Sequence, residues 1–272
     1  MFAYVGILDS GLGGLTVARA LRGRAPALPI FYLGDTAWFP YGGQDPRELE
    51  ERVLTVGRSL IDHGCTALVV ACNTATSAAL ERLRAELPVP VIGMEPPLKP
   101  AAARTTSGRV IVLATAGTAS GERLARLEAT HASGVTVHTV PMPGLADLIE
   151  AGRARDPQVL EMLERAIGEP IALGADAVAL GCTHYGFIEE PLRRMLPPHV
   201  AIIDAADAVA RRTLAVLAEA GQRVPAGAPL QVDYDVTGDH RAFAAALECL
   251  RDVGEALPDL ADIRRRPVAT GS

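Results

Sequence analysis

The 272-residue sequence has no uninterrupted apolar stretch long enough to span a bilayer, so it predicts no transmembrane helix and no membrane partner. Its N-terminus lacks a basic segment followed by an apolar core and a cleavage site, which argues against a signal peptide. Four cysteines are too few and too scattered for a disulfide framework, and none forms the Cys-x-x-Cys pair typical of structural zinc. We therefore expect a cytoplasmic protein without a metal ion.

Basic residues are also scarce. The 26 lysines and arginines are outnumbered by 32 acidic residues, and the net charge is −6. A mildly acidic surface gives no reason to expect nucleic acid as a partner, because nucleic acids attract basic patches. Lys99 is the only lysine, and its surroundings do not resemble a pyridoxal-binding site, so a Schiff-base mechanism is not expected.

Short apolar runs alternate with longer helical patterns along the chain, which predicts a doubly wound, flavodoxin-like α/β fold with parallel sheets. With 49% hydrophobic residues, the chain can build one large core or two smaller ones. One helix is expected at 46–63, where Pro46 stands in the first turn and an apolar face runs from Leu49 to Leu60. Other helices are expected at 156–168 and 207–220. The expected strands are 4–8, 30–33, 67–71, 89–92, 110–114, 135–140, 177–181, 200–203 and 231–236.

Two strand–turn patterns occur twice, at similar offsets. Residues 7–11 resemble 112–116, and residues 69–74 resemble 179–184. We interpret this as a weak internal repeat of two related α/β halves. The proline-rich stretch 95–100 is suited to the crossing between them. The expected domains are therefore residues 1–96 with 206–272, and residues 97–205.

Cys72 ends one apolar run and precedes a helical pattern. A thiol there lies at the C-terminal end of a strand, which is the edge where open α/β sheets bind ligands. The N-terminus of the next helix would lower the pKa of the thiol and attract a carboxylate. The alternative is a core cysteine that packs as a small hydrophobe.

Cys182 repeats this arrangement, and Thr183 and His184 follow it. His184 either tunes the thiol and donates a proton, or is a hydrogen-bonded structural histidine. If the two halves face each other, the two thiols meet across one cleft. Two cysteines at equivalent strand ends therefore favour a catalytic interpretation.

Three other turns carry polar residues after strands. Asp9 opens a glycine-rich turn that lacks the spacing of the dinucleotide fingerprint, and its carboxylate is suited to accept or relay a proton. The stretch 34–43 is either a cap over a small anionic substrate or a rigid turn. Thr115 and Thr118 either bind a carboxylate or cap a helix that begins near Ser120.

Taken together, these segments resemble the glutamate racemase family over essentially the whole chain. The two cysteine motifs, 71–75 and 180–185, are the most specific part of the resemblance. It implies two pseudo-symmetric α/β domains with the active site between them. It also implies a homodimer that interconverts L- and D-glutamate without a cofactor and supplies D-glutamate for peptidoglycan. The supporting segments are 6–17, 34–36, 40–42, 114–118 and 236–239.

The resemblance also implies residue roles. Cys72 and Cys182 are the paired acid and base, with Cys72 facing the proton of D-glutamate, and Asp9 and His184 assist them. Glu150 supports the histidine. The sequence departs from the family pattern at Gly186, which follows Tyr185 at a position where the family often has proline. This departure removes no catalytic group. The residues expected to bind substrate are Asp9, Ser10, Tyr41, Gly42, Asn73, Thr74, Thr183 and His184, and those expected one layer behind are Glu150, Thr76, Thr115 and Thr118.

Racemisation requires a proton to leave one face of Cα and another to arrive on the opposite face. A cysteine thiol, with its usual pKa near ~8.5, is suited to both tasks. Because no electron sink is expected, oriented donors in a dry cleft must stabilise the carbanion. The alternatives are a racemase of aspartate or a related small acid, a decarboxylase that uses one cysteine, and a non-catalytic protein that binds a small anion.

Overall fold

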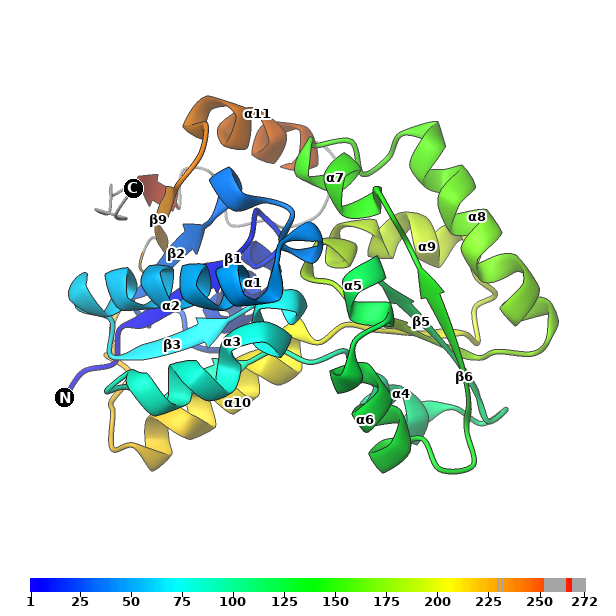
Figure 1. Ribbon diagram of the computed structural model, residues 1–272, viewed down its shortest axis with the longest axis horizontal. Helices are drawn as coiled ribbons and strands as arrows, with labels where there is room; N and C mark the ends of the chain where they lie inside the picture. The colour runs from blue at the N-terminus through cyan, green and yellow to red at the C-terminus, as the bar shows by residue number, and fades with distance from the viewer. Residues whose placement is uncertain (229, 231, 252–262, 266–272) are drawn as a thin grey trace.

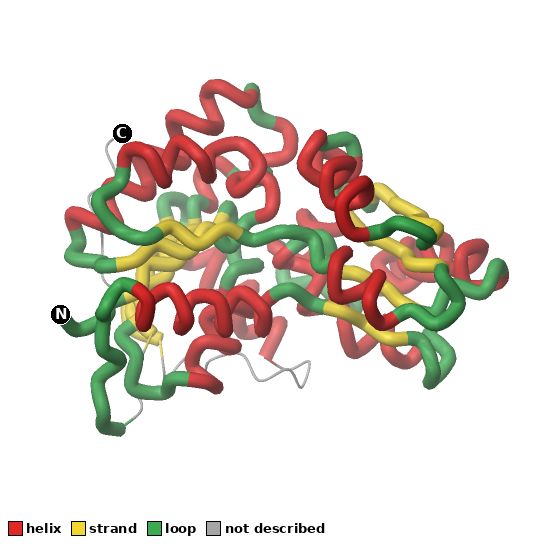
Figure 2. The backbone as a smooth tube through the Cα atoms, turned by 90° about the horizontal axis from the view of Figure 1, so that it is seen from below, coloured by secondary structure: helices red, strands yellow, loops and turns green. Residues whose placement is uncertain are grey.

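The computed structural model describes residues 1–228, 230, 232–251 and 263–265. These residues form two parallel β-sheets, each covered by helices on both faces, as Figures 1 and 2 show. The predicted α/β class and its two halves are therefore confirmed. In the described part of the chain no helix combines the length and the apolar character that crossing a bilayer requires.

The two sheets share one strand order. The first sheet runs β10-β9-β2-β1-β3-β4 and the second runs β6-β5-β7-β8, so β2-β1-β3-β4 and β6-β5-β7-β8 are equivalent. This equivalence explains the repeat in the sequence. The strands of the first sheet are β1 (Val5–Asp9), β2 (Ile30–Gly34), β3 (Ala67–Val70), β4 (Val91–Gly93), β9 (Val232–Val236) and β10 (Ile263–Arg265), and those of the second are β5 (Arg109–Ala114), β6 (Thr136–Pro141), β7 (Ala177–Leu180) and β8 (Ala201–Ile203).

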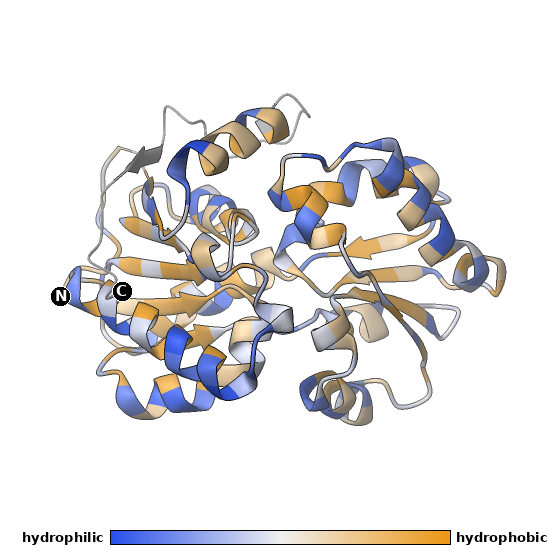
Figure 3. Cartoon of the chain, turned by 45° about the horizontal axis from the view of Figure 1, so that its top comes forward, coloured by the Kyte–Doolittle hydropathy of each residue, from blue (hydrophilic) through white to orange (hydrophobic). Residues whose placement is uncertain are grey.

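Alternating residues of each strand pack into different helical layers. In β1, Leu8 packs with residues of α2 and α3, whereas Ile7 packs with residues of α1 and α10. The second sheet is covered by α4 and α6 on one face and by α8 and α9 on the other. Figure 3 shows the hydrophobic residues gathered in the strands and on the inner sides of the helices. These helices are α1 (Leu15–Arg24), α2 (Pro46–Asp62), α3 (Asn73–Glu86), α4 (Leu98–Arg104), α6 (Glu122–His131), α8 (Pro157–Ala172), α9 (Glu189–Met195) and α10 (Ala206–Glu219).

One hydrophobic cluster runs through both halves. It includes Ile7 of β1 and Leu113 of β5, both fully buried, together with residues of α8 and α10. The chain leaves the first sheet after β4 and returns to it through α10, whose residues pack against α1. The division into residues 1–96 with 206–272 and residues 97–205 agrees with this path but stays a prediction, and residues 252–262 and 266–272 lie outside the described part.

Short elements fill the space near the carboxyl ends of the strands. They are the turns η1 (Thr36–Trp38), η2 (Tyr41–Gly43) and η3 (Thr183–Ile188) and the helices α5 (Ala116–Ala119) and α7 (Leu145–Glu150). Helix α11 (His240–Arg251) follows β9. The helix expected near Ser120 is two helices, α5 and α6, which are separated at Ser120 and Gly121. Strand β10 had no expected counterpart.

Candidate active site

The two cysteines lie on equivalent turns. Cys72 follows β3 and is the N-cap of α3, and Cys182 follows β7 and precedes η3. Both are buried, with 7% and 9% of their surface exposed. The negative charge of Cys182 contributes to raising the pKa of Cys72. The fold therefore brings the two thiols within electrostatic reach of each other.

The pKa of Cys72 moves in the direction opposite to the one expected from the sequence. Burial is the largest cause and raises this pKa to about 12, and the charge of Asp9 raises it further. The N–H of Ala75, in the first turn of α3, and the hydroxyl of Ser10 hydrogen-bond to the sulfur and lower its pKa, but by less. The predicted lowering was wrong because burial of the thiol raises its pKa by more than the helix N-terminus lowers it.

Cys182 lies at the end of a chain of polar contacts. Its Sγ is 3.8 Å from Nδ1 of His184, and Nε2 of the same ring is 2.7 Å from Oε2 of Glu150. Burial alone would lower the pKa of His184, but its hydrogen bonds to Cys182 and Glu150 hold that pKa well above its usual value. His184 therefore stands as an imidazolium between a carboxylate and the Cys182 sulfur.

Asp9 and Glu150 both connect the two halves. Oδ2 of the fully buried Asp9 accepts the Thr183 hydroxyl at 3.1 Å, and its Oδ1 accepts the N–H of Gly11 at 2.9 Å. Oε2 of Glu150 accepts the N–H of Leu12 at 2.8 Å as well as contacting His184. Burial is the main reason that the pKa of Asp9 is raised. The turn after β1 is thus bonded directly to the second half.

The glycines of this turn allow that approach. A Cβ at Gly13 would lie 2.5 Å from Thr183 Oγ1, 2.6 Å from His184 Nδ1 and 2.8 Å from the backbone nitrogen of His184. A Cβ at Gly11 would lie 2.6 Å from the carboxyl carbon of Glu150. Real side chains essentially never approach so closely, and the backbone nitrogen cannot move aside without moving its turn. The glycine-rich turn is therefore the surface against which Thr183, His184 and Glu150 of the second half pack.

Asn73 has a buried side-chain amide beside Cys72. Its side chain is buried, and neither its Oδ1 nor its Nδ2 has a hydrogen-bond partner among the described residues. Buried polar atoms are almost always paired, so an unpaired amide beside Cys72 fits a group that binds a polar substrate. Thr74 is half-buried in the next position, and Ser10 is buried against Cys72.

Tyr41 and Gly42 lie on η2, which faces α5 of the second half. The hydroxyl of Tyr41 donates to Asp35 Oδ2 at 2.7 Å. A Cβ at Gly117 of α5 would lie 3.3 Å from the carbonyl oxygen of Gly42, so the two turns are in close contact. Tyr41 and Cys72 belong to the same buried cluster, so the tyrosine ring lies near that thiol.

The three threonines expected one layer behind the site make structural hydrogen bonds. Thr76 Oγ1 donates to the carbonyl of Val70 at 3.1 Å and accepts the N–H of Met94 at 3.0 Å. Thr115 caps α5 by accepting the N–H of Thr118 at 3.2 Å, and its hydroxyl donates to that of Thr118 at 3.0 Å. Thr115 therefore caps a helix, which was one of the two roles expected for Thr115 and Thr118. The helix that it caps is α5, which begins at Ala116 and not near Ser120.

Several residues near the site were not identified from the sequence. Asp35 was included only as part of the stretch 34–43 and Thr237 only as part of the segment 236–239, without roles of their own, and Arg52 was not considered. The ring of Phe39 lies 5.4 Å from that of His184, centre to centre. The available signal was that Asp35 stands directly after β2, as Asp9 stands at the end of β1, and the N–H of Asp35 donates to the carbonyl of Asp9 at 2.8 Å. Within the described residues, His, Cys, Asp and Glu form no group of three suited to a metal ion.

Comparison with known proteins agrees with this arrangement. The model of the Asp/Glu/hydantoin racemase family matches residues 15–213. A glutamate racemase of Pseudomonas aeruginosa is 46% identical over 216 residues, which are 79% of this chain and 82% of that protein. The chain belongs to the glutamate racemase family. The racemase resembles that of Ralstonia pickettii with 42% identity over 271 residues, covering 98% and 95% of the two chains.

Solved structures lead to the same family. The racemase superimposes on Escherichia coli glutamate racemase, in complex with L-glutamate and the activator UDP-MurNAc-ala, with a TM-score of 0.83 and 29% identity over 98% of this chain and 99% of that one. Glutamate racemase from Thermus thermophilus gives a TM-score of 0.75 with 33% identity, covering 97% and 96% of the two chains. The interconversion of amino-acid enantiomers is thus the activity of the family to which this chain belongs.

Proposed function

We propose that this racemase interconverts L- and D-glutamate by a two-base mechanism that uses Cys72 and Cys182. The observation that carries the proposal is that two buried thiols follow equivalent strands of two halves, and that hydrogen bonds from Thr183 to Asp9 and from Leu12 to Glu150 join these halves beside them. Each thiol has a different assistant, since Asp9 influences Cys72 and His184 contacts Cys182.

In the direction from L- to D-glutamate, the thiolate of Cys182 removes the Cα proton and the thiol of Cys72 donates its own proton to the opposite face. The imidazolium of His184, 3.8 Å from the Cys182 sulfur, balances the charge of that thiolate. The high pKa of Cys72 keeps it protonated and ready to donate. The reverse direction exchanges the two roles, and in each direction one proton is lost and one is gained.

The carbanion needs donors that are already oriented. The unpaired amide of Asn73 and the hydroxyls of Ser10 and Thr74 lie on the Cys72 side of the site, and Thr183 lies on the Cys182 side. In a cleft that excludes water, such donors stabilise developing charge far more than they do in solution. We propose that these residues, with Tyr41 and Gly42, bind the substrate carboxylates and amino group.

Heavy water tests this mechanism. Turnover of L-glutamate in D₂O, without added cofactor, should place one deuterium at Cα of every D-glutamate formed, because the incoming proton comes from a thiol that exchanges with solvent. Circular dichroism measures the inversion, and mass spectrometry measures the isotope. D-glutamate that retains the Cα hydrogen would contradict the two-base mechanism. Inversion of L-aspartate in preference to L-glutamate would favour the alternative substrate.

The setting of the reaction follows from the same proposal. D-glutamate made by this enzyme would enter bacterial peptidoglycan, and we place the enzyme in the cytoplasm, where the two thiols stay reduced. The homodimer implied by the family resemblance remains part of this proposal.

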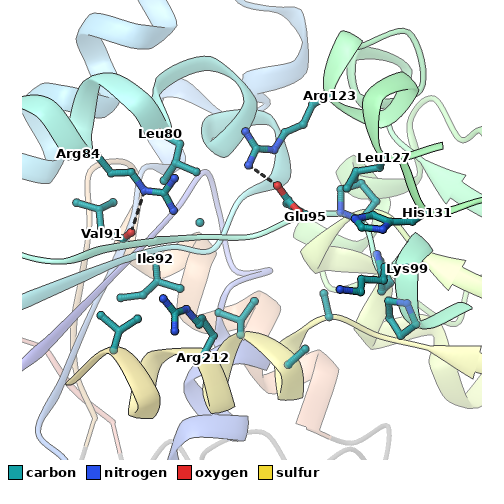
Figure 4. A pocket seen from close by; sticks show the side chains of 18 residues that line it. Leu80, Arg84, Val91, Ile92, Glu95, Lys99, Arg123, Leu127, His131 and Arg212 are labelled. Atoms are coloured by element: carbon teal, nitrogen blue, oxygen red, sulfur yellow. Dashed lines mark hydrogen bonds and ion pairs between the residues drawn. The ribbon is translucent and has the colours of Figure 1, made fainter. Parts of the chain in front are cut away.

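A basic cavity between the halves supports a second role, the binding of an anionic activator. The cavity has a volume of about 370 Å³, and Figure 4 shows it between α3 and α10 of the first half and α6 of the second. One of its lining residues, Glu95, is acidic. The Nε of Arg123 is buried and has no hydrogen-bond partner in the described part of the chain, while its Nη2 pairs with Glu95. The cationic lining residues and histidine are Arg84, Lys99, Arg123, His131 and Arg212.

The E. coli relative was crystallised with an activator, UDP-MurNAc-ala, and we expect the same compound to raise kcat of this racemase at least about fivefold. Arg123→Gln should remove the activation. Arg126→Gln, on the same helix but outside the cavity lining, is the matched control and should keep it. Kinetic constants that do not respond to the compound would rule out this role and leave the two-base mechanism untouched.

A further inference from the structure

Asp35 directly follows β2 and lies close to the candidate site. Its side chain is completely buried. Its backbone N–H donates to the carbonyl of Asp9, and its own carbonyl accepts the N–H of Trp38 at 3.0 Å, within η1. A buried carboxylate requires compensating partners, so the groups that surround Asp35 show what it holds.

Three side chains donate four hydrogen bonds to this carboxylate. Arg52 of α2 binds it with a fork, with Nε 2.9 Å from Oδ2 and Nη2 2.7 Å from Oδ1. The hydroxyl of Tyr41 donates to Oδ2 at 2.7 Å, and that of Thr237 donates to Oδ1 at 2.6 Å. A two-bond guanidinium–carboxylate pair fixes the carboxylate plane as well as its position. The direction in which Asp35 accepts the Tyr41 hydroxyl is therefore set by α2.

Tyr41 depends on this contact. Its side chain is buried, with 2% exposed, and burial, followed by the nearby charge of Asp35, raises its pKa well above the usual value. The phenol therefore stays protonated and remains a donor to Asp35. The same tyrosine opens η2, which contacts α5 of the other half, and its phenol lies near Cys72. Asp35 thus fixes a turn that lies between one thiol and the opposite half.

We infer that Asp35 is a positioning residue that holds the substrate-binding turn 41–43 in place through the Tyr41 hydroxyl. The inference rests on the proposed function, because it takes this turn as part of the glutamate site. Asp35 itself touches no substrate, so its loss weakens binding of both enantiomers and of the transition state alike. Such a loss of uniform binding raises KM and leaves kcat nearly unchanged.

Three variants test the inference: Asp35→Asn, Tyr41→Phe and the double variant. We expect each single variant to raise KM about tenfold for both enantiomers, with kcat within about threefold of wild type, which corresponds to ~1.4 kcal/mol of binding. L- and D-glutamate have equal free energies, so kcat/KM must fall by the same factor in both directions. The KM of the double variant should be within about threefold of the KM of the more affected single variant, because both replacements remove the same hydrogen bond.

Thr237→Val is the matched control. It removes a donor to the same carboxylate but leaves the Arg52 fork and the Tyr41 bond, so KM should stay within about twofold of wild type even if the melting temperature falls. Equal rises of KM in Thr237→Val and Asp35→Asn would overturn the inference, because Asp35 would then only stabilise the fold. Tyr41→Phe keeps the ring and its packing, so a wild-type KM in that variant overturns the inference even if Asp35→Asn fails to fold.

Failure of this inference is distinguishable from failure of the two-base mechanism. Asp35→Asn and Tyr41→Phe should still incorporate one Cα deuterium per inversion in D₂O. A fall of kcat by more than about a hundredfold with unchanged KM would place Asp35 in the chemistry instead of behind the turn. An absence of Cα deuterium in the wild-type product would instead remove the two-base mechanism on which the inference rests.

Discussion

Replacing either Cys72 or Cys182 with serine should reduce the rate of racemisation by at least about a thousandfold, since a positioned acid or base contributes about 10²–10⁴ and a hydroxyl is a much weaker acid than a thiol. Each thiol serves one face of Cα, so the loss of one stops inversion in both directions. Circular dichroism of each enantiomer with purified variant measures the effect. Full activity of either variant would refute the assignment.

Deuterium exchange makes this test more specific. With Cys182→Ser, the remaining Cys72 should still remove and return the proton of D-glutamate, so deuterium enters that enantiomer without inversion. Cys72→Ser should do the same with L-glutamate. Exchange of the same enantiomer by both variants would contradict the placement of the two thiols on opposite faces.

Cys65→Ser is the matched control. Cys65 precedes β3, whereas Cys72 follows it, so the two cysteines stand at opposite ends of one strand, and both are buried. Cys65→Ser should lower the free energy of unfolding by about 1–2 kcal/mol, the effect of burying a new hydroxyl, and leave kcat and KM unchanged. Loss of activity in this variant would mean that the effect of a cysteine replacement comes from damage to the fold.

Gly13→Ala should lower kcat about a hundredfold, because displacing catalytic groups by about 1 Å has this effect. The new methyl group would lie 2.8 Å from the backbone nitrogen of His184, so η3 must move away from the first half. That movement would carry His184 and Cys182 away from Cys72. Gly13 does not have a positive φ, so the alanine backbone is unstrained and the effect is steric.

Gly23→Ala provides the comparison for Gly13→Ala. Gly23 lies inside α1, where a Cβ would meet none of the described residues beyond its own turn of helix within 4 Å, so alanine should stabilise the helix by about 0.5–1 kcal/mol and leave the kinetics unchanged. Thermal unfolding and steady-state kinetics of both variants separate a fold effect from a site effect. Wild-type kcat for Gly13→Ala would show that the two halves do not approach this closely during turnover.

The sequence predicted those features that depend on local pattern. Continuous apolar runs gave nearly every strand, and the repeated run before Cys72 and Cys182 matched the shared strand order of the two sheets. Burial is a property of the whole fold, so the helix N-terminus expected after Cys72 suggested a lowered pKa, whereas burial of the thiol raises it. Helix ends near Ser120 were placed wrongly because two short helices meet there.

The Asp35 cluster lay beyond sequence reasoning for a different reason. Its members Arg52 and Thr237 are 17 and 202 positions away along the chain, and no periodicity relates them. Glu150 also accepts the backbone N–H of Leu12, which is 138 positions away along the chain. Every residue except proline has a backbone N–H, so the residue type at position 12 gives no indication of this contact. Contacts of this kind emerge only when the two halves are placed together.

The shared strand order of the sheets has a consequence for chirality. L- and D-glutamate are mirror images, but a chain of L-amino acids cannot build two halves that mirror each other. The position equivalent to Asp9 is Ala114, and the one equivalent to His184 is Thr74. In the proposed mechanism each enantiomer has its own thiol but the neighbouring groups differ, so the enzyme would bind its two substrates in unequal complexes even though it must bring them to equal concentrations.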